Sequence, residues 1–217
     1  MVISEIYEGI EGSGVRIGTL QLFVRTFGCK VKCKNCDTKY TWNSTENRKN
    51  TVEMSPKMLM DYVDKSELPW VSITGGDPLL QREEVAEFID LCHESDKFVN
   101  IEATGLFNDS LVFSKCDFIS ADIKTPNTGI LADPDVILDL YNSYENIQFK
   151  AVVANQEDLD YIKCYKIPVV LTPCWEPGKK LNKTFLHDVQ ELLKIRPNFR
   201  MIVQQHKFLF GADAKLV

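Results

Sequence analysis

Residues 29–38 read Cys29-Lys-Val-Lys-Cys33-Lys-Asn-Cys36-Asp37-Thr38, directly after the strand-like run Leu20-Gln-Leu-Phe-Val-Arg25. The cysteines have the spacing C-x3-C-x2-C. A four-iron cluster usually takes four cysteine ligands, so a loop with three cysteines leaves one iron open to another ligand. We therefore expect Cys29, Cys33 and Cys36 to hold a [4Fe-4S] cluster whose open iron binds a further ligand that the cluster can reduce.

A structural zinc site is the first alternative use of this loop. Such a site normally closes with four Cys or His ligands, whereas the three histidines are remote in sequence and no second C-x2-C follows. An electron-transfer ferredoxin would place a fourth cysteine nearby, followed by proline, and this chain does not. The other cysteines occur singly and are expected to be ordinary core or surface residues rather than disulfides: Cys92, Cys116, Cys164 and Cys174. A non-enzymatic zinc-binding module stays open as an alternative.

Length and composition suit an α/β enzyme of one domain, residues 1–217. Hydrophobic residues make up 44% and charged residues 26%, as in ordinary globular proteins. The net charge of −6 and the pI near 5.2 argue against direct nucleic-acid binding. The N-terminal residues do not resemble a signal peptide, and no apolar run is long enough to span a membrane. We expect a cytoplasmic protein.

Strand-like and helix-like segments alternate along the chain. Strands are expected at 20–25, 70–74, 98–102, 118–123, 147–153, 167–171 and 199–204. Helices are expected from Ser55-Pro56 through Val63 and at 82–95, 134–144, 156–161 and 183–195. This order predicts a parallel sheet with right-handed crossovers, either open or curled into a partial barrel.

Polar and turn residues follow the strands at their carboxyl ends. After the cysteine loop come Gly75-Gly76-Asp77-Pro78, Glu102-Ala-Thr104-Gly105, Lys124-Thr125-Pro126, Thr172-Pro173 and Gln205-His206-Lys207. Each of them alone is explained by a turn or a surface charge. Because the carboxyl ends of parallel strands converge on one edge, where ligands bind, we expect these segments to share a site.

The cysteine loop together with Gly75-Gly76-Asp77-Pro78 resembles the radical S-adenosylmethionine enzymes, which have an incomplete parallel β/α barrel. Within that superfamily the chain is similar, almost end to end, to the 7-carboxy-7-deazaguanine synthases. The carrying segments are Glu5-Ile-Tyr, Glu11-Gly12-Ser13-Gly14, Phe23-Val24-Arg25-x-x-Gly28-Cys29, Cys36-Asp37-Thr38-x-Tyr40-x-Trp42, Thr74-Gly75-Gly76-Asp77-Pro78-Leu79-Leu80-Gln81 and Gln205-His206-Lys207.

The chain departs from the family pattern at a few positions. Asn35 stands where an aromatic residue usually precedes the third cysteine, so packing against the adenine would fall to Tyr40 or Trp42. Asp77 replaces the usual Glu and can still accept a hydrogen bond. Glu11 and Ser13 stand in place of the more common Gln and Glu, which bears on substrate contacts rather than on the cluster.

The resemblance implies a radical enzyme that uses a [4Fe-4S] cluster, S-adenosylmethionine and Mg²⁺. It would convert 6-carboxy-5,6,7,8-tetrahydropterin into 7-carboxy-7-deazaguanine with loss of ammonia, a carbon–nitrogen lyase step of 7-deazapurine biosynthesis such as that of queuosine. S-adenosylmethionine would be regenerated in each turnover. A one-electron reductant such as flavodoxin or ferredoxin and a homodimeric state are further implications. A glycyl-radical-enzyme activase would share the cysteine loop and is the alternative among radical enzymes.

The resemblance also assigns roles to residues. Thr38 would bind Mg²⁺, with Asp37 as its neighbour. Contacts to S-adenosylmethionine would come from Gly75, Gly76, Asp77, Asn35, Tyr40, Ser120 and Lys124. Arg25 would bind the substrate carboxylate as a charged fork, Glu102 would accept from the pterin N–H edge, and His206 would bond the ring from the far side. The remaining expected substrate contacts are Glu11, Gly12, Thr104 and Gly105. Apart from the cluster and the cofactor radical, no catalytic residue is expected.

Overall fold

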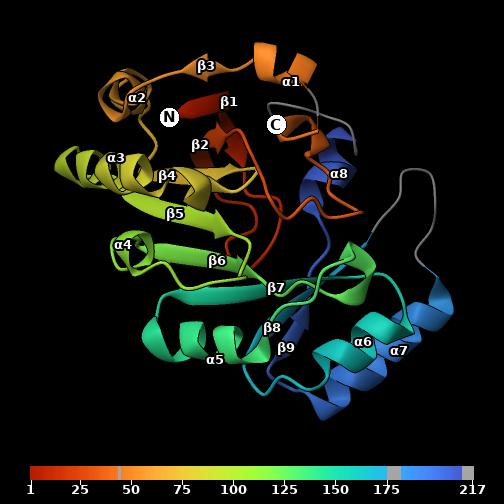
Figure 1. Ribbon diagram of the computed structural model, residues 1–217. Coiled ribbons are helices and arrows are strands. Elements are labelled where there is room, and N and C mark those ends of the chain that lie inside the picture. Colours follow the sequence, from red (N-terminus) through yellow and green to blue (C-terminus); the bar gives the residue numbers. More distant parts are fainter. Residues whose placement is uncertain (44, 175–181, 212–217) are drawn as a thin grey trace.

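A single mixed sheet organises the chain (Figure 1). The structure is a computed structural model that describes residues 1–43, 45–174 and 182–211. The order of strands across the sheet is β3-β1-β2-β4-β5-β6-β7-β8-β9. Their bounds are β1 (Val2–Ile10), β2 (Leu20–Thr26), β3 (Val52–Glu53), β4 (Trp70–Gly75), β5 (Phe98–Ala103), β6 (Phe118–Asp122), β7 (Ile147–Val153), β8 (Val169–Pro173) and β9 (Phe199–Met201).

The sheet is mostly parallel and open. β1 pairs antiparallel with both β2 and β3, whereas every pairing from β2 onward to β9 is parallel. In the described part of the chain, β3 and β9 are the two edges of the sheet and do not pair with each other. The expected α/β fold of the partial-barrel type is therefore confirmed.

The parallel strands have an apolar face and a face that carries most of their polar residues. Residues paired across neighbouring strands point to the same side of a sheet, so the register defines both faces. One face carries the buried residues Val71, Ile73, Val99, Ile101, Ile119, Ala121, Phe149, Ala151, Val169 and Leu171. The other carries Ser72, Thr74, Asn100, Glu102, Ser120, Asp122, Gln148, Lys150 and Thr172. The apolar face supports the fold, and the polar face is available for a ligand.

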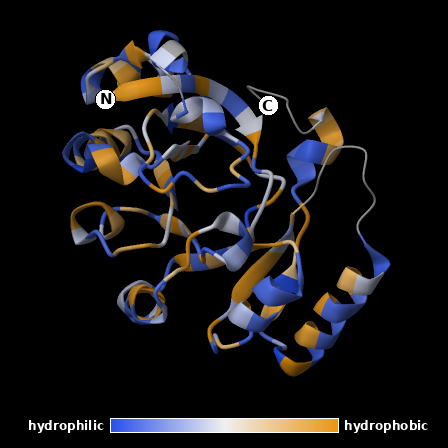
Figure 2. Ribbon diagram, turned by 45° about the vertical axis from the view of Figure 1, so that its right-hand side comes forward, coloured by the Kyte–Doolittle hydropathy of each residue, from blue (hydrophilic) through white to orange (hydrophobic). Residues whose placement is uncertain are grey.

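Helices α2 to α7 cover the apolar face and bury apolar residues against it, whereas α8 buries none. Figure 2 shows apolar and polar residues on opposite sides of these helices. Each fully buried Val, Ile or Phe contributes roughly 1.5–3 kcal/mol of hydrophobic stabilisation. The bounds are α1 (Thr45–Lys49), α2 (Pro56–Val63), α3 (Arg82–Glu94), α4 (Ser110–Phe113), α5 (Pro134–Ser143), α6 (Gln156–Ile162), α7 (Lys183–Ile195) and α8 (Gln205–Phe210), with the short 3-10 turns η1 (Lys39–Thr41), η2 (Pro78–Gln81) and η3 (Pro126–Thr128).

Side-chain caps fix the starts of several helices. Ser55 accepts from the backbone N–H of Met58, and Pro56 occupies the first turn of α2, as the sequence indicates. Asn155 and Asp158 form a reciprocal capping box at α6. The expected helices are found with ends shifted by at most one residue. Within the described residues, no helix is long and apolar enough to cross a membrane.

Two expectations for the sheet need correction. The strand expected at 199–204 ends at Met201, because Gln205 N–H bonds to Gly12 O at 2.8 Å and the chain turns into α8. The strand expected at 167–171 runs instead over Val169–Pro173. β1 was not expected from the sequence, because its acidic residues interrupt the pattern of a buried strand.

Candidate active site

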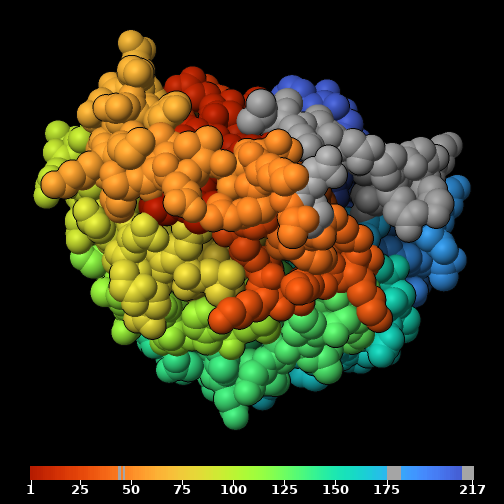
Figure 3. Space-filling view, turned by 45° about the horizontal axis from the view of Figure 1, so that its top comes forward, coloured from red at the N-terminus to blue at the C-terminus, as the bar shows by residue number. Residues whose placement is uncertain are grey.

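A pocket of about 460 Å³ opens at the carboxyl ends of the parallel strands. Its walls come from the β1–β2 loop, the cysteine loop, the ends of β2 and β4 to β8, and the start of α8. In Figure 3 the orange-red surface of the cysteine loop borders the green surface that follows β6. The two segments are joined there by the bond from Lys34 N–H to Thr128 O at 2.9 Å. The strand-end segments thus converge on one cavity, as the sequence predicts.

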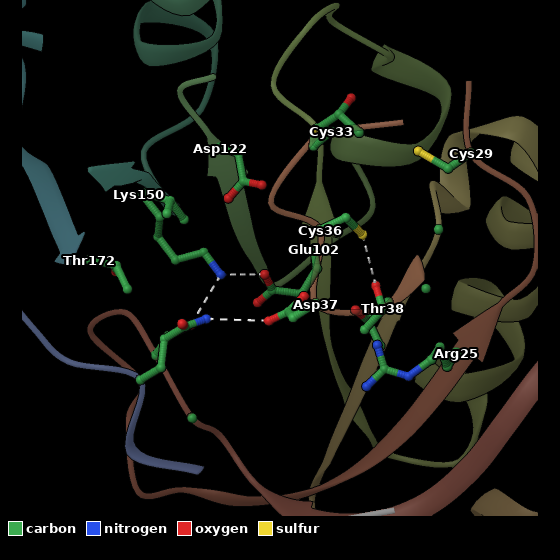
Figure 4. A pocket seen from close by; sticks show the side chains of 18 of the residues that line it. Arg25, Cys29, Cys33, Cys36, Asp37, Thr38, Glu102, Asp122, Lys150 and Thr172 are labelled. Atoms are coloured by element: carbon green, nitrogen blue, oxygen red, sulfur yellow. Dashed lines mark hydrogen bonds and ion pairs between the residues drawn. The ribbon is translucent and has the colours of Figure 1, made fainter. Parts of the chain in front are cut away.

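The three cysteines of the loop are half-buried and line this pocket together (Figure 4). Burial raises the pKa of the Cys33 thiol, and the nearby Lys124 ammonium opposes this shift. The described residues contain no group of three His, Cys, Asp or Glu side chains placed to hold a single metal ion. Three separate thiols on one wall fit a four-iron cluster, in which each thiol binds a different iron.

Cys36 receives polar contacts from the residues that follow it. The indole N–H of Trp42 donates to Cys36 Sγ at 3.4 Å, and the Thr38 hydroxyl lies 3.6 Å from the same sulfur. Hydrogen bonds to cluster sulfurs are one of the means by which a protein adjusts the reduction potential. The ring nitrogen of Trp42 thus faces the thiol of Cys36.

The paired glycines after β4 are required by the protein's own backbone. A Cβ on Gly76 would lie 2.1 Å from the carbonyl oxygen of Gly28, and one on Gly75 would lie 2.3 Å from the oxygen of Thr26. Gly75 also has a φ of +142°, a conformation that L side chains rarely adopt. The end of β4 is thus pressed against the base of the cysteine loop, and both glycines line the pocket beside Cys29.

Three of the expected contact residues are not brought to the pocket wall. Asp77 is 2% exposed, and its carboxylate caps η2 by accepting from the Leu79 N–H at 3.3 Å. Gly105 forms a left-handed turn, where a Cβ would lie 2.0 Å from the Asp122 carbonyl oxygen. Ser120 lies beneath the pocket, with its hydroxyl already hydrogen-bonded. The structure gives these residues supporting contacts rather than a place on the pocket surface.

A hydrogen-bonded row of polar side chains forms the floor under the pocket. Asn100 donates to the Ser72 hydroxyl at 2.7 Å, and Gln148 donates to the Ser120 hydroxyl at 2.6 Å. Ser120 in turn donates to Asn100 at 3.4 Å, so the row crosses four neighbouring strands. Buried polar groups that are fully paired hold one another in place. The row therefore fixes the layer on which the pocket-lining residues stand.

Arg25 enters the pocket wall from β2 with two protein partners. Its Nε donates to Glu5 at 2.8 Å, and its Nη2 donates to the Tyr7 hydroxyl at 2.7 Å. Tyr40 donates to the same Glu5 carboxylate at 2.9 Å. Burial by itself would lower the pKa of Arg25, but Tyr7, Tyr40 and Glu5 outweigh it and raise the pKa. The guanidinium is thus charged and held in one orientation.

A second charged group stands on the opposite wall, where β5, β6 and β7 end. Lys150 forms an ion pair with Glu102 Oε2, and Lys124 pairs with Asp122 at 2.6 Å. Figure 4 shows the Lys150 ammonium directed at Glu102. Glu11 lies close enough that burial, and then the charge of Glu102, raise the pKa of its carboxyl.

Lys150 and Asp122 line the pocket although they were not expected from the sequence, whereas Thr172 belongs to a segment that was. The signal that would have found them is the alternation within the strands, since Glu102, Asp122, Lys150 and Thr172 all interrupt apolar runs at every second residue.

The start of α8 closes the pocket on the side of the β1–β2 loop. His206 packs against Gly12, and Gln204 donates to Asp37 Oδ2 at 3.4 Å. Lys207 lies 3.8 Å from the same carboxylate. The expected residues Gly12 and His206 are thus brought together, and Asp37 connects the cysteine loop to the C-terminal part of the described chain.

Several polar atoms of the pocket have no hydrogen-bond partner among the described residues. They are Oε1 of Glu102, Oγ1 of Thr104 and Oγ1 of Thr172, all of them buried. Leaving a buried polar atom unpaired costs about 1–3 kcal/mol. A polar ligand in this pocket would satisfy these atoms.

Comparisons with known proteins agree with this site. A family described as a 4Fe-4S single cluster domain matches residues 10–139. A 7-carboxy-7-deazaguanine synthase from Thermoplasma acidophilum is 30% identical, covering 97% of this chain and 98% of its own. One from Methanospirillum hungatei is 31% identical, covering 96% and 85%. The crystal structure of QueE from Escherichia coli has a similar fold, with a TM-score of 0.71, 20% identity and 94% of each chain covered.

The open parallel sheet and the cysteine loop at its carboxyl edge define an enzyme of the radical S-adenosylmethionine class, with a four-iron cluster. Within that class, the chain belongs to the 7-carboxy-7-deazaguanine synthase family. The resemblance seen in the sequence is confirmed.

Proposed function

We propose that this enzyme converts 6-carboxy-5,6,7,8-tetrahydropterin into 7-carboxy-7-deazaguanine with loss of ammonia, as a carbon–nitrogen lyase of 7-deazapurine biosynthesis. Its family membership supports this reaction. The observation that carries the proposal is that one pocket joins three cysteine thiols to the Arg25 guanidinium and to the unpartnered Oε1 of Glu102. The thiols suit the cluster, the guanidinium suits the substrate carboxylate, and Oε1 of Glu102 suits a ring N–H.

The cofactor side of the pocket is the wall formed by the cysteine loop and the end of β4. Cys29, Cys33 and Cys36 would hold the cluster, which together with S-adenosylmethionine supplies the radical when both are bound. The backbone of Gly75 and Gly76 lines the pocket next to the thiols. Asn35, Tyr40 and Lys124 also line this side. Asp77 and Ser120 would act on the cofactor only by supporting these neighbours.

The substrate side is formed by Arg25 and by the strand ends opposite it. The bonds to Glu5 and Tyr7 use Nε and Nη2, which leaves Nη1 of Arg25 without a protein partner in the described chain. A carboxylate at this position would gain a charge-assisted hydrogen bond. Glu102 would accept from the pterin N–H edge, while His206 bonds the ring from the side of α8. Glu11, Gly12 and Thr104 complete this wall, and Gly105 shapes it from behind.

Thr38 is the proposed ligand of Mg²⁺. Its hydroxyl lies on the pocket wall between the cysteine loop and Arg25 (Figure 4). A hydroxyl oxygen suits Mg²⁺, which usually keeps several waters and binds only one or two protein or substrate oxygens. The substrate carboxylate held by Arg25 would be the second ligand.

Other parts of the proposal concern the protein as a whole. We propose that it acts in the cytoplasm as a homodimer of single-domain chains, and that flavodoxin or ferredoxin delivers the electron. Direct binding of nucleic acid or membranes is not part of this function, in keeping with the net charge of −6.

The decisive experiment is an anaerobic assay of reconstituted protein with S-adenosylmethionine, Mg²⁺, a reductant and the carboxylated tetrahydropterin. The expected product is 7-carboxy-7-deazaguanine, detected by mass spectrometry together with ammonia. Cofactor cleavage without any pterin binding, accompanied by a glycyl radical on a partner protein, would support the activase instead. A colourless protein that binds only zinc would support the zinc module.

A further inference from the structure

Lys150 contacts two separate walls of the pocket through a single charge. It comes from β7, where it pairs in register with Asp122 of β6. Its ammonium forms an ion pair with Glu102 Oε2 and lies 3.5 Å from the Ser13 hydroxyl in the β1–β2 loop. With 8% of its surface exposed, Lys150 is buried. A buried cation of this kind is retained only when its partners compensate for the loss of water.

Lys150 contacts only one of the two oxygens of the Glu102 carboxylate. Oε2 is taken by the ammonium, whereas Oε1 is buried and has no partner within the described residues. An ionised carboxylate can only accept hydrogen bonds. The pair therefore presents one acceptor oxygen, held at a fixed position, to whatever occupies the pocket.

The surrounding charges favour the same arrangement. Burial by itself would lower the pKa of Lys150, but Glu102, Asp122 and Glu11 outweigh it and raise the pKa. Asp122 has its own cation in Lys124 at 2.6 Å, and Glu11 accepts from Gln21 at 2.8 Å. Glu102 is therefore the main partner of Lys150.

We propose that Lys150 is a positioning residue for substrate recognition: by holding Oε2 of Glu102, it presents Oε1 to the N–H edge of the bound pterin. This inference rests on the proposed function and adds a residue to it. Lys150 does not touch the reacting atoms, so its effect reaches the substrate through Glu102. Without the ammonium, Glu102 would lose both its fixed orientation and its charge partner.

Binding of the carboxylated tetrahydropterin to the reconstituted enzyme tests this role. Calorimetry is done anaerobically with S-adenosylmethionine present and without a reductant, so that no turnover occurs. We expect Lys150→Met and Glu102→Gln each to weaken pterin affinity by roughly tenfold to a hundredfold, the usual effect of an unpaired buried polar group. The double variant should bind no worse than Glu102→Gln, because the two residues act as one unit.

The controls separate this role from general stability. Lys150→Arg keeps the charge and should recover part of the affinity. Lys115→Met breaks an ion pair with Asp90 outside the pocket and should bind pterin as the wild type does. If Lys150→Met does not fold, the double variant, which buries no unpaired charge, is compared with Glu102→Gln in its place.

Some results would overturn the inference. Wild-type affinity in Lys150→Met is one, and a further large loss in the double variant relative to Glu102→Gln is another, since either means that Lys150 does not act through Glu102. Absence of pterin binding by the wild type is a separate outcome, and it would contradict the proposed function itself.

Discussion

Gly12 and His206 fit together only because residue 12 has no side chain. A Cβ on Gly12 would lie 2.0 Å from Nδ1 of the His206 ring. The carbonyl oxygen of Gly12 also accepts from the Gln205 N–H at 2.8 Å. The β1–β2 loop and the start of α8 are therefore fitted to each other at the mouth of the pocket.

Replacing Gly12 by Ala should displace His206 and weaken pterin binding. We expect a loss of about 1–3 kcal/mol in the free energy of unfolding, as for other overpacked sites, and a clear loss of pterin affinity measured by calorimetry. Gly18→Ala is the matched control, because Gly18 has a φ of +89° and nothing within 4 Å of the added Cβ. That variant should lose stability through backbone strain alone, while pterin affinity stays near that of the wild type.

Replacing any one of Cys29, Cys33 or Cys36 by Ala should abolish cluster assembly. Each thiol is expected to bind a different iron, so none can substitute for another. The measurement is the recovery of iron–sulfur absorbance after anaerobic reconstitution, followed by cleavage of S-adenosylmethionine. Ser substitutions at Cys92, Cys116, Cys164 and Cys174 should leave the absorbance unchanged. A comparable loss in one of these four would mean that the cluster has a fourth protein ligand.

Thr38→Ala should lower turnover and reduce its dependence on Mg²⁺, with the cluster absorbance retained. The physical reason is the loss of one hard oxygen ligand from a metal that tolerates few substitutes. Turnover is measured against Mg²⁺ concentration for the wild type, Thr38→Ala and Thr38→Ser, and the Ser variant should regain much of the response. Identical Mg²⁺ curves for all three would remove Thr38 from the metal site.

Thr172→Val should separate binding from stability. The Thr172 hydroxyl is buried and has no partner among the described residues, so its removal should leave the free energy of unfolding unchanged or higher by up to about 1 kcal/mol. Pterin affinity should fall by roughly tenfold if the hydroxyl contacts the substrate. In the control Thr125→Val, the lost hydroxyl donates to Val152 O, so that variant should be destabilised instead. Unchanged affinity in Thr172→Val would exclude this contact.

The pH dependence of stability should reflect His206. Burial lowers its pKa below the usual 6.5, although the Asp37 carboxylate opposes the shift. Below about pH 6.5 the unfolded chain takes up a proton that the folded chain does not, so stability falls as the pH decreases through this range. The melting temperature should therefore drop less between pH 7 and 5 in His206→Gln than in the wild type. His187→Gln, at a side chain that is 67% exposed, is the control, and it should follow the wild type.

The sequence predicts the order of the core elements and the edge of the sheet where the pocket lies. Local signals suffice for both, since β-branched runs mark the strands and caps such as Ser55 mark the helix starts. The sequence does not reveal β1. This strand pairs with β2, but its acidic residues interrupt the apolar run by which a buried strand is recognised.

The site shows the same division between local and tertiary information. The cysteine spacing and the glycine pair are local, and the structure brings them to one pocket wall. The Lys150 and Glu102 pair joins residues that lie far apart in the chain, so it does not follow from neighbouring residues, whereas the cap that Asp77 forms with Leu79 is local. Contacts across the sheet become visible only when the register is known.

The alternation of core-facing and pocket-facing residues along β4 to β8 has a consequence for how this enzyme tolerates mutation. Positions that face the helices, such as Ile73 and Ala121, would fail in a screen for folded protein, because they are buried in the core. Positions that face the pocket, such as Thr74 and Thr172, would pass that screen and fail only in a screen for product. A saturation library should therefore be measured for protein abundance and for activity in parallel. Along each strand, the positions that reduce abundance should alternate with the positions that reduce activity alone.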